Sequence, residues 1–116
     1  MANKAKKKGT AAETAVVNYL TENGFTDAHR VALHGNKDMG DVAFITQDGR
    51  SVCVEVKNTK EIPLSNFVTQ AITERENSGS DLGFCVAKRP RKGSPGDWYV
   101  LLTLDELLRF INTNLE

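Results

Sequence analysis

Residues 40–58, GDVAFITQDGRSVCVEVKN, constrain the fold more than any other part of the chain. Two stretches in which apolar and polar residues alternate flank an Asp-Gly pair, and this pattern is typical of a β-hairpin. Because side chains on a strand alternate between its two faces, the three valines of residues 51–57 face one side. Glu55 and Lys57 therefore lie together on the other face at the strand's end, and Asp41 opens the partner strand. We expect a hairpin whose valines enter a core and whose rim carries two acids and a lysine.

The length of the connecting loop decides whether the two acids meet. A two-residue turn at the Asp-Gly pair sets Asp41 opposite Val56, which puts Asp41 on the wrong face. A three-residue loop at residues 47–49, with its glycine left-handed, sets Asp41 directly opposite Glu55. An Asp-Gly pair by itself favours the shorter turn, so the sequence leaves both registers open.

Two carboxylates that face each other repel, and a folded protein accepts that repulsion where a divalent cation bridges them. Carboxylate oxygens suit magnesium, which also binds phosphate groups. Lys57 can stabilise negative charge on a phosphorus atom or orient an attacking water. The alternative is that Asp41, Glu55 and Lys57 form exposed ion pairs, which is the commoner arrangement for acids on strands. The core-like strands and the acid-x-lysine order at a strand end favour the metal site.

Glu13, near the N-terminus, has two interpretations. It fits a capping box with Thr10 at the start of a helix. It also lies three, four and seven residues before Val16, Val17 and Leu20, and so shares the apolar stripe of that helix. An acid on this inward face can reach the metal site while it also caps the helix.

The chain of 116 residues, 40% of them hydrophobic, predicts one small α/β domain at residues 10–116. Residues 1–9 are small, polar and basic, which predicts a flexible N-terminal arm. We expect helices at about 10–23, 63–78 and from Thr103 onward, and strands at about 27–33, 41–46, 51–58, 82–88 and 98–102. The order α-β-β-β-α-β-β-α predicts a central mixed β-sheet with helices packed on it. In the last helix we expect the leucines and Ile111 to face inward.

The net charge of zero hides two basic segments. They hold eight of the fifteen Lys and Arg residues, namely Lys4, Lys6, Lys7 and Lys8 near the N-terminus and Lys88, Arg89, Arg91 and Lys92 in a later loop. Local charge density governs phosphate affinity, so these segments favour DNA binding. A solvated tail and a soluble loop are the ordinary alternative.

Other features exclude several classes of protein. Cys53 and Cys85 stand alone in apolar segments, so we expect free, buried thiols and no zinc site. No apolar run is long enough to span a membrane, and no apolar signal core follows the basic N-terminus. We therefore expect a cytoplasmic protein.

Asp41, then thirteen residues, then Glu55-Val56-Lys57, resembles the PD-(D/E)XK nuclease motif, with GD in place of PD. Glu13 matches an acid that these enzymes often carry on their first core helix. The expected element order over about residues 10–102 resembles the restriction-endonuclease-like α-β-β-β-α-β core, here followed by a further strand and a C-terminal helix. Within that superfamily, KGTAAETAVVNYLTENGF and GDV…VEVKN are most similar to the small Holliday junction resolvases of archaea and phages.

This resemblance implies a homodimeric endonuclease that resolves four-way junctions in double-stranded DNA by paired phosphodiester hydrolysis. It implies a prokaryotic, archaeal or phage-infected cell as the setting. It further implies a Mg²⁺ ion, with Mn²⁺ as a substitute, bound by Glu13, Asp41, Glu55 and the Val56 carbonyl, and a catalytic role for Lys57.

Further positions are possible extensions of this site. Gln70, Asp38 and Thr59 are candidates for residues next to the metal, although a surface glutamine and a loop acid are the alternatives for the first two. The additional candidates for DNA contact are Arg30, Lys37 and Lys60. We do not expect His34 to be the base, since a lone loop histidine is most often structural or solvated.

Two other functions remain open from the sequence. One is a restriction-type or repair nuclease of the same fold, which would prefer ordinary duplex or damaged ends. The other is a non-catalytic nucleic-acid-binding module, against which the intact acids and lysine argue. The apolar residues at 98–102 and in the last helix form either a dimer contact or simply part of the core.

Overall fold

The computed structural model of the protein describes residues 4–32 and 38–112. Its elements are α1 (Lys4–Glu22), β1 (His29–Arg30), β2 (Val42–Ile45), β3 (Ser51–Lys57), α2 (Leu64–Ser78), β4 (Leu82–Ala87), the 3₁₀ turn η1 (Pro95–Asp97), β5 (Tyr99–Leu101) and α3 (Leu104–Ile111). The five strands form one sheet in the order β1-β2-β3-β4-β5, in which β3 and β4 are parallel and the other neighbours are antiparallel. The mixed sheet and the order of the elements confirm the predicted α/β fold.

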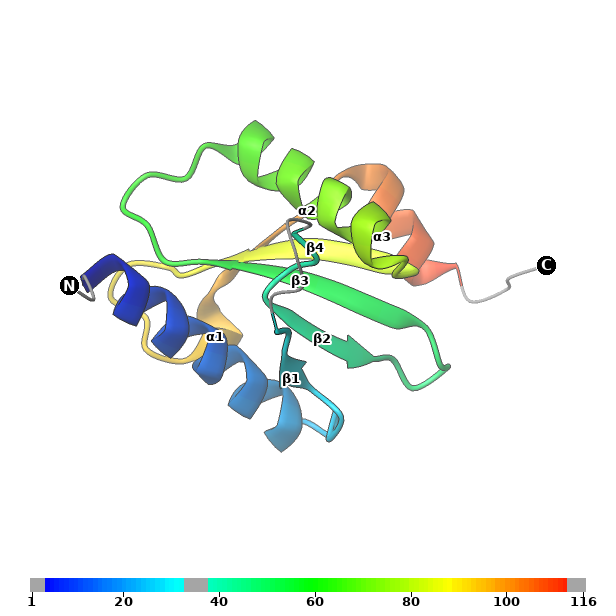
Figure 1. Ribbon diagram of the computed structural model, residues 1–116, viewed down its shortest axis with the longest axis horizontal. Helices are drawn as coiled ribbons and strands as arrows, with labels where there is room; N and C mark the ends of the chain where they lie inside the picture. Colours follow the sequence, from blue (N-terminus) through cyan, green and yellow to red (C-terminus); the bar gives the residue numbers. More distant parts are fainter. Residues whose placement is uncertain (1–3, 33–37, 113–116) are drawn as a thin grey trace.

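Helix α1 covers one face of the sheet and α2 the other, with α3 beside α2 near one end (Figure 1). The α1 face holds the larger core, which consists of Ala12, Val16, Val42, Phe44, Val52, Val54, Val56, Leu82, Val86 and Trp98. On the α2 face, Phe67 and Ala71 pack against Cys85. Both cysteines are buried and form no disulfide, as the sequence predicted. No helix in the described ranges is long and apolar enough to cross a membrane.

The hairpin between β2 and β3 has the register expected of the three-residue loop. The pairing runs from Val42 with Val54 to Ile45 with Ser51, and just before β2 the Asp41 amide donates to the Val54 carbonyl at 2.9 Å. Asp41 therefore lies beside Glu55, and the two carboxyl groups interact. Gly49 has φ +89°, which is the left-handed conformation that the three-residue loop requires. The three-residue loop is therefore confirmed.

Polar contacts within the loop explain why the longer turn forms despite the Asp-Gly pair. The Thr46 amide donates to the Arg50 carbonyl at 2.8 Å, and the Arg50 amide donates to the Thr46 hydroxyl at 2.9 Å. The Thr46 hydroxyl in turn contacts the Asp48 carboxylate. These side-chain bonds stabilise the turn beyond what the Asp-Gly preference alone indicates.

Two boundaries differ from the sequence prediction. Helix α1 begins at Lys4 and not near Thr10, so the expected capping box is wrong, because Thr10 lies within the helix. Alanine and lysine are strong helix formers, which explains the earlier start. Strand β1 has two residues in place of the seven that were expected. Whether residues 1–9 act as a separate arm stays a prediction.

Helix α3 contradicts the expectation for its apolar face. Its N-cap is Thr103, as predicted, but Leu104, Leu107, Leu108 and Ile111 are between 42% and 70% exposed. The residue of α3 that is buried is Glu106, which lies 3.0 Å from Arg75 Nε of α2 and accepts a hydrogen bond from the Gly83 amide of β4. The ion pair, the bond to the Gly83 amide and the packing of Phe110 on Phe84 place the face of α3 that carries Glu106 and Phe110 against the protein, and the leucines therefore face outward.

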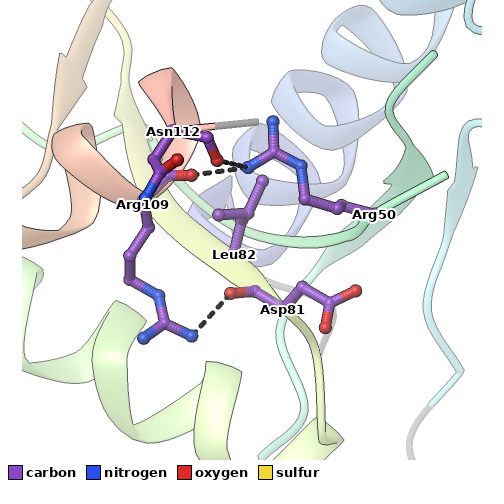
Figure 2. A pocket seen from close by; sticks show the side chains of 5 residues that line it. All are labelled: Arg50, Asp81, Leu82, Arg109 and Asn112. Atoms are coloured by element: carbon purple, nitrogen blue, oxygen red, sulfur yellow. Dashed lines mark hydrogen bonds between the residues drawn. The ribbon is translucent and has the colours of Figure 1, made fainter. Parts of the chain in front are cut away.

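Arg50 fixes the C-terminal end of α3 to the hairpin (Figure 2). Its side chain is 8% exposed and lies 3.0 Å from the Asp48 carboxylate. Its guanidinium donates to the carbonyls of Arg109, Phe110 and Asn112, which are carbonyls that a helix end leaves unpaired. The surrounding pocket of about 240 Å³ is lined by Arg50, Asp81, Leu82, Arg109 and Asn112, so it is part of this structural contact and lies apart from the rim acids.

We expect Arg50→Ala to lower the free energy of unfolding by about 2–4 kcal/mol, because three carbonyls and Asp48 lose a buried donor. Urea denaturation measures the change. Arg109→Ala is the matched control, because Arg109 lines the same pocket but its side chain is 50% exposed. The control should cost less than about 1 kcal/mol. Equal losses in the two variants would contradict the assigned role of Arg50.

Candidate active site

The hairpin brings Asp41 and Glu55 together at the rim of the sheet. Glu55 is 5% exposed on the polar face of β3. The Val56 amide donates to Asp41 Oδ2 at 2.8 Å, which fixes the Asp41 carboxylate at the start of β2. Burial, followed by the charge of Glu55, raises the pKa of Asp41 to about 7. The two acids therefore interact strongly. Their burial also costs hydration free energy, which exposed ion pairs retain.

Glu13 approaches the same acids from α1. Burial and then the charge of Asp41 raise the pKa of Glu13, while Arg30 acts to lower it. The Arg30 Nε atom lies 3.0 Å from Glu13 Oε1, so Arg30, a candidate for DNA contact, pairs with this acid. Glu13 thus faces the rim acids, as its place on the apolar stripe predicted.

Lys57 completes the predicted set. Its Nζ atom lies 3.0 Å from Glu55 Oε2 and 5.1 Å from the centre of the Phe67 ring. Burial acts to lower the pKa of Lys57, but the hydrogen bond and charge of Glu55 outweigh it, and the pKa is raised. Lys57 therefore remains a cation at the end of β3.

Sequence reasoning missed Glu74 of α2, which is fully buried. It lies one helical turn after Gln70, whose Nε2 atom donates to Glu55 Oε2 at 2.9 Å and to Glu74 Oε2 at 3.0 Å. Oxygens of Asp38, Glu55 and Glu74 lie within 4.8 Å of one another, so this cluster could hold a metal ion. Glu74 shares the inward stripe with Phe67 and Ala71, and this is the signal that could have found it.

A proton is the alternative to a cation in this cluster. Burial, together with hydrogen bonds to Glu55 and Asp38, raises the pKa of Glu74 to about 11. The pKa of Asp38 is lowered, first by its hydrogen bond with Glu74. In the absence of a cation, Glu74 is therefore the neutral, proton-donating member of the group.

The other candidates lie at varying distances from these acids. Asp38 and Gln70 join the cluster, whereas Thr59 donates to the Glu61 carbonyl at 2.6 Å and is exposed. Lys60 is also exposed. His34 and Lys37, and the side chains of Lys4, Lys6 and Lys7, lie outside the part of the chain that the structure describes.

The basic loop after β4 starts directly beside Lys57. Because β3 and β4 are parallel, their C-terminal ends meet, and the Lys88 amide donates to the Lys57 carbonyl at 2.8 Å. Lys88 lies 5.6 Å from the Trp98 ring and Arg89 lies 5.8 Å from the Tyr99 ring. The start of α1 lies at the same end of the molecule (Figure 1). Both basic segments therefore lie toward the end of the sheet that carries Lys57.

The raised pKa of Asp41 predicts how the stability of the metal-free protein depends on pH. The unfolded chain releases this proton near pH 4, whereas the folded protein keeps it to about pH 7. The stabilisation is therefore complete below about pH 4 and is lost as the pH rises through about 7. We expect Asp41→Asn to flatten the fall in unfolding free energy between about pH 5 and 7, as measured by urea denaturation in EDTA. An equally steep fall in the variant would contradict this.

Comparison with known proteins agrees with this geometry. No protein-family model matches the chain, and no curated protein matches it. A solved structure of Hjc, a Holliday junction resolvase from the archaeal hyperthermophile Archaeoglobus fulgidus, is similar, with a TM-score of 0.57 and 28% identity, over 81% of this chain and 71% of that one. This similarity supports a related nuclease role. The fold and sequence are thus consistent with a resolvase of the PD-(D/E)XK type, which confirms the resemblance drawn from the motif.

Proposed function

We propose that this protein is a magnesium-dependent endonuclease that resolves four-way DNA junctions by paired hydrolysis of phosphodiester bonds. The observation that carries the proposal is the meeting of Asp41 and Glu55 at the open end of the hairpin, with the Lys57 ammonium 3.0 Å from the Glu55 carboxylate. The similarity to the archaeal resolvase supports it.

The residues at the rim fit a hard divalent cation. Glu55 Oε1 is buried and has no hydrogen-bond partner among the described residues, and the neighbouring donor groups are carboxylates. In the proposed site, Glu13, Asp41, Glu55 and the Val56 carbonyl would hold the ion. Among the described residues, the acids within 4.8 Å of one another are Asp38, Glu55 and Glu74, so Glu13 would have to leave Arg30 and move closer to Asp41 and Glu55. When bound there, a magnesium ion supplies Lewis acidity toward a scissile phosphate.

The chain's own residues supply the fixed positive charge, the positioning of Asp41 and the phosphate contacts. Lys57 places a fixed positive charge where negative charge develops on the phosphate. The Val56 amide holds Asp41 in position through a hydrogen bond of 2.8 Å. Lys88, Arg89, Arg91 and Lys92 follow the adjacent strand and provide phosphate contacts close to this charge. Such contacts read the geometry of the backbone and carry no base code.

Cleavage assays test the catalytic assignment. We expect Glu55→Ala and Lys57→Ala each to lower the rate of junction cleavage in Mg²⁺ by about a hundredfold or more, while junction binding persists. Glu61→Ala is the control, because Glu61 is a nearby exposed acid, and it should cleave at the wild-type rate. Wild-type rates in both active-site variants would refute the assignment.

The same assay identifies the substrate when four-way junctions, flaps, nicked duplexes and linear duplexes are compared. A preference for the four-way junction supports a resolvase. Equal cleavage of all four substrates would favour the restriction-type or repair nuclease instead. Binding with no cleavage of any substrate would favour the non-catalytic module.

We further propose that the exposed apolar face of α3 contacts a second copy of the chain. Leu104, Leu107, Leu108 and Ile111 lie three and four residues apart on one face, and such a contiguous exposed patch is typical of an interface. Strand β5, which precedes α3 in the chain, is an edge strand, with Val100 53% exposed. Two symmetric cuts require two active sites, which a two-fold dimer supplies.

Charged residues on this face should separate the dimer. We expect the double variant Leu104→Glu with Leu108→Glu to be monomeric by analytical ultracentrifugation, at concentrations where the wild type is dimeric. Ile45→Glu is the control, because Ile45 is an apolar residue of β2 that is 43% exposed, and it should remain dimeric. A dimeric double variant, or a monomeric wild type, would contradict the assignment.

A further inference from the structure

Asp38, Glu55 and Glu74 form a cluster of acids on the α2 side of the rim. Their oxygens lie within 4.8 Å of one another. Each is held from a different element, since Asp38 precedes β2, Glu55 lies on β3 and Glu74 lies on α2. The Gly40 amide donates to Asp38 Oδ1 at 3.1 Å, and Asn77 donates to the Asp38 carbonyl at 3.0 Å. The three carboxylates are therefore positioned by the fold, and they do not meet as free surface groups.

The hydrogen-bond donors around this cluster reach only some of its carboxylate oxygens. Gln70 donates to one oxygen of Glu55 and to one oxygen of Glu74, and Lys57 pairs with the same Glu55 oxygen. The remaining oxygens, Glu55 Oε1 and Glu74 Oε1, are buried, and no nitrogen or hydroxyl donor of the described residues reaches them. Their residues are 5% and 0% exposed. Without a cation, the proton on Glu74 is the donor that the three acids share. Buried carboxylate oxygens without donors are costly, and a cation removes that cost.

The balance of charges within the cluster also favours a bound cation. Of the ion pairs between described residues, the Lys57–Glu55 pair alone involves a member of this cluster. One ammonium thus faces Asp38, Glu55 and the proton-donating Glu74, and a divalent cation would take the place of the Glu74 proton. Adjacent ligand oxygens of an octahedral magnesium ion lie about 3.0 Å apart, and opposite ones about 4.2 Å. The three acids lie within 4.8 Å of one another, so they would have to draw closer around a bound ion.

This group is distinct from the set proposed for nuclease chemistry. Glu13 pairs with Arg30, and Asp41 Oδ2 is occupied by the Val56 amide, whereas Glu74 and Asp38 have no role in that set. The two sets share only Glu55, which lies between them. Glu55 Oε2 already contacts Gln70 and Lys57, so Oε1 is the oxygen that would be shared between the two ions.

We propose that Asp38, Glu55 and Glu74 bind a divalent cation of their own, separate from the one proposed at Glu13 and Asp41. The site is formed by carboxylates alone, so it selects a hard cation such as Mg²⁺ or Mn²⁺. It does not depend on DNA cleavage, because the ligands are in place without substrate.

Counting bound Mn²⁺ tests the proposal directly. Metal-free protein is titrated with Mn²⁺, and the ions bound per chain are counted by electron paramagnetic resonance and by calorimetry. We expect two ions in the wild type, one in Glu74→Gln and one in Asp38→Asn. Asp38 is exposed, so its variant keeps the test valid if the buried substitution at Glu74 disturbs folding. Glu76→Gln is the matched control, since Glu76 is an exposed acid of the same helix, and it should bind two ions.

The result also separates this site from the proposed nuclease site. An ion that is lost in Glu74→Gln and in Asp38→Asn but kept in Asp41→Asn supports the new site, whether or not the protein cleaves DNA. An ion that is lost only in Asp41→Asn overturns the new site and leaves the nuclease proposal intact. Unchanged stoichiometry and affinity in both Glu74→Gln and Asp38→Asn would also overturn it.

Discussion

The repulsion between Asp41 and Glu55 depends on a single choice of strand register. With the loop one residue shorter, Asp41 would turn toward the valine core, and the rim would carry one acid in place of two. The Thr46 bonds across the loop and the left-handed Gly49 hold the longer turn in place. The same turn ends in Arg50, which anchors α3, so the register also governs how the last helix docks.

The rim acids form a row that runs from α1 across the sheet to α2. Asp41, Glu55, Glu74 and Asp38 each affect the pKa of a neighbour in this row, and the charge of Asp41 helps to raise the pKa of Glu13. Arg30 and Lys57 are the two cations that pair with it among the described residues. The fold therefore concentrates negative charge in a partly desolvated place, and this arrangement is typical of sites that bind cations or hold protons.

Local patterns predicted the parts of this structure that local chemistry determines. The alternation in β3 revealed which side chains share a face, and the stripe on α1 correctly placed Glu13 toward the rim. The sequence could not decide between the two-residue and the three-residue loop. The turn preference of the Asp-Gly pair takes no account of the hydrogen bonds that Thr46 forms with Arg50. It missed Glu74 because a buried acid on a helix becomes visible only when its partners on other elements are known. The amphipathic pattern of α3 identified an apolar face but could not say that Glu106, paired with Arg75, would face the protein instead.

The clamp formed by Arg50 has a geometric consequence for the proposed dimer. Arg50 follows the loop whose register places Asp41, and its guanidinium holds the last carbonyls of the helix that carries the exposed leucines. The contacts between the active site and the proposed dimer surface therefore run through the hairpin loop and the end of α3. In such a dimer, the separation of the two active sites depends on these contacts. The arms of a bound DNA junction would then have to adapt to that separation.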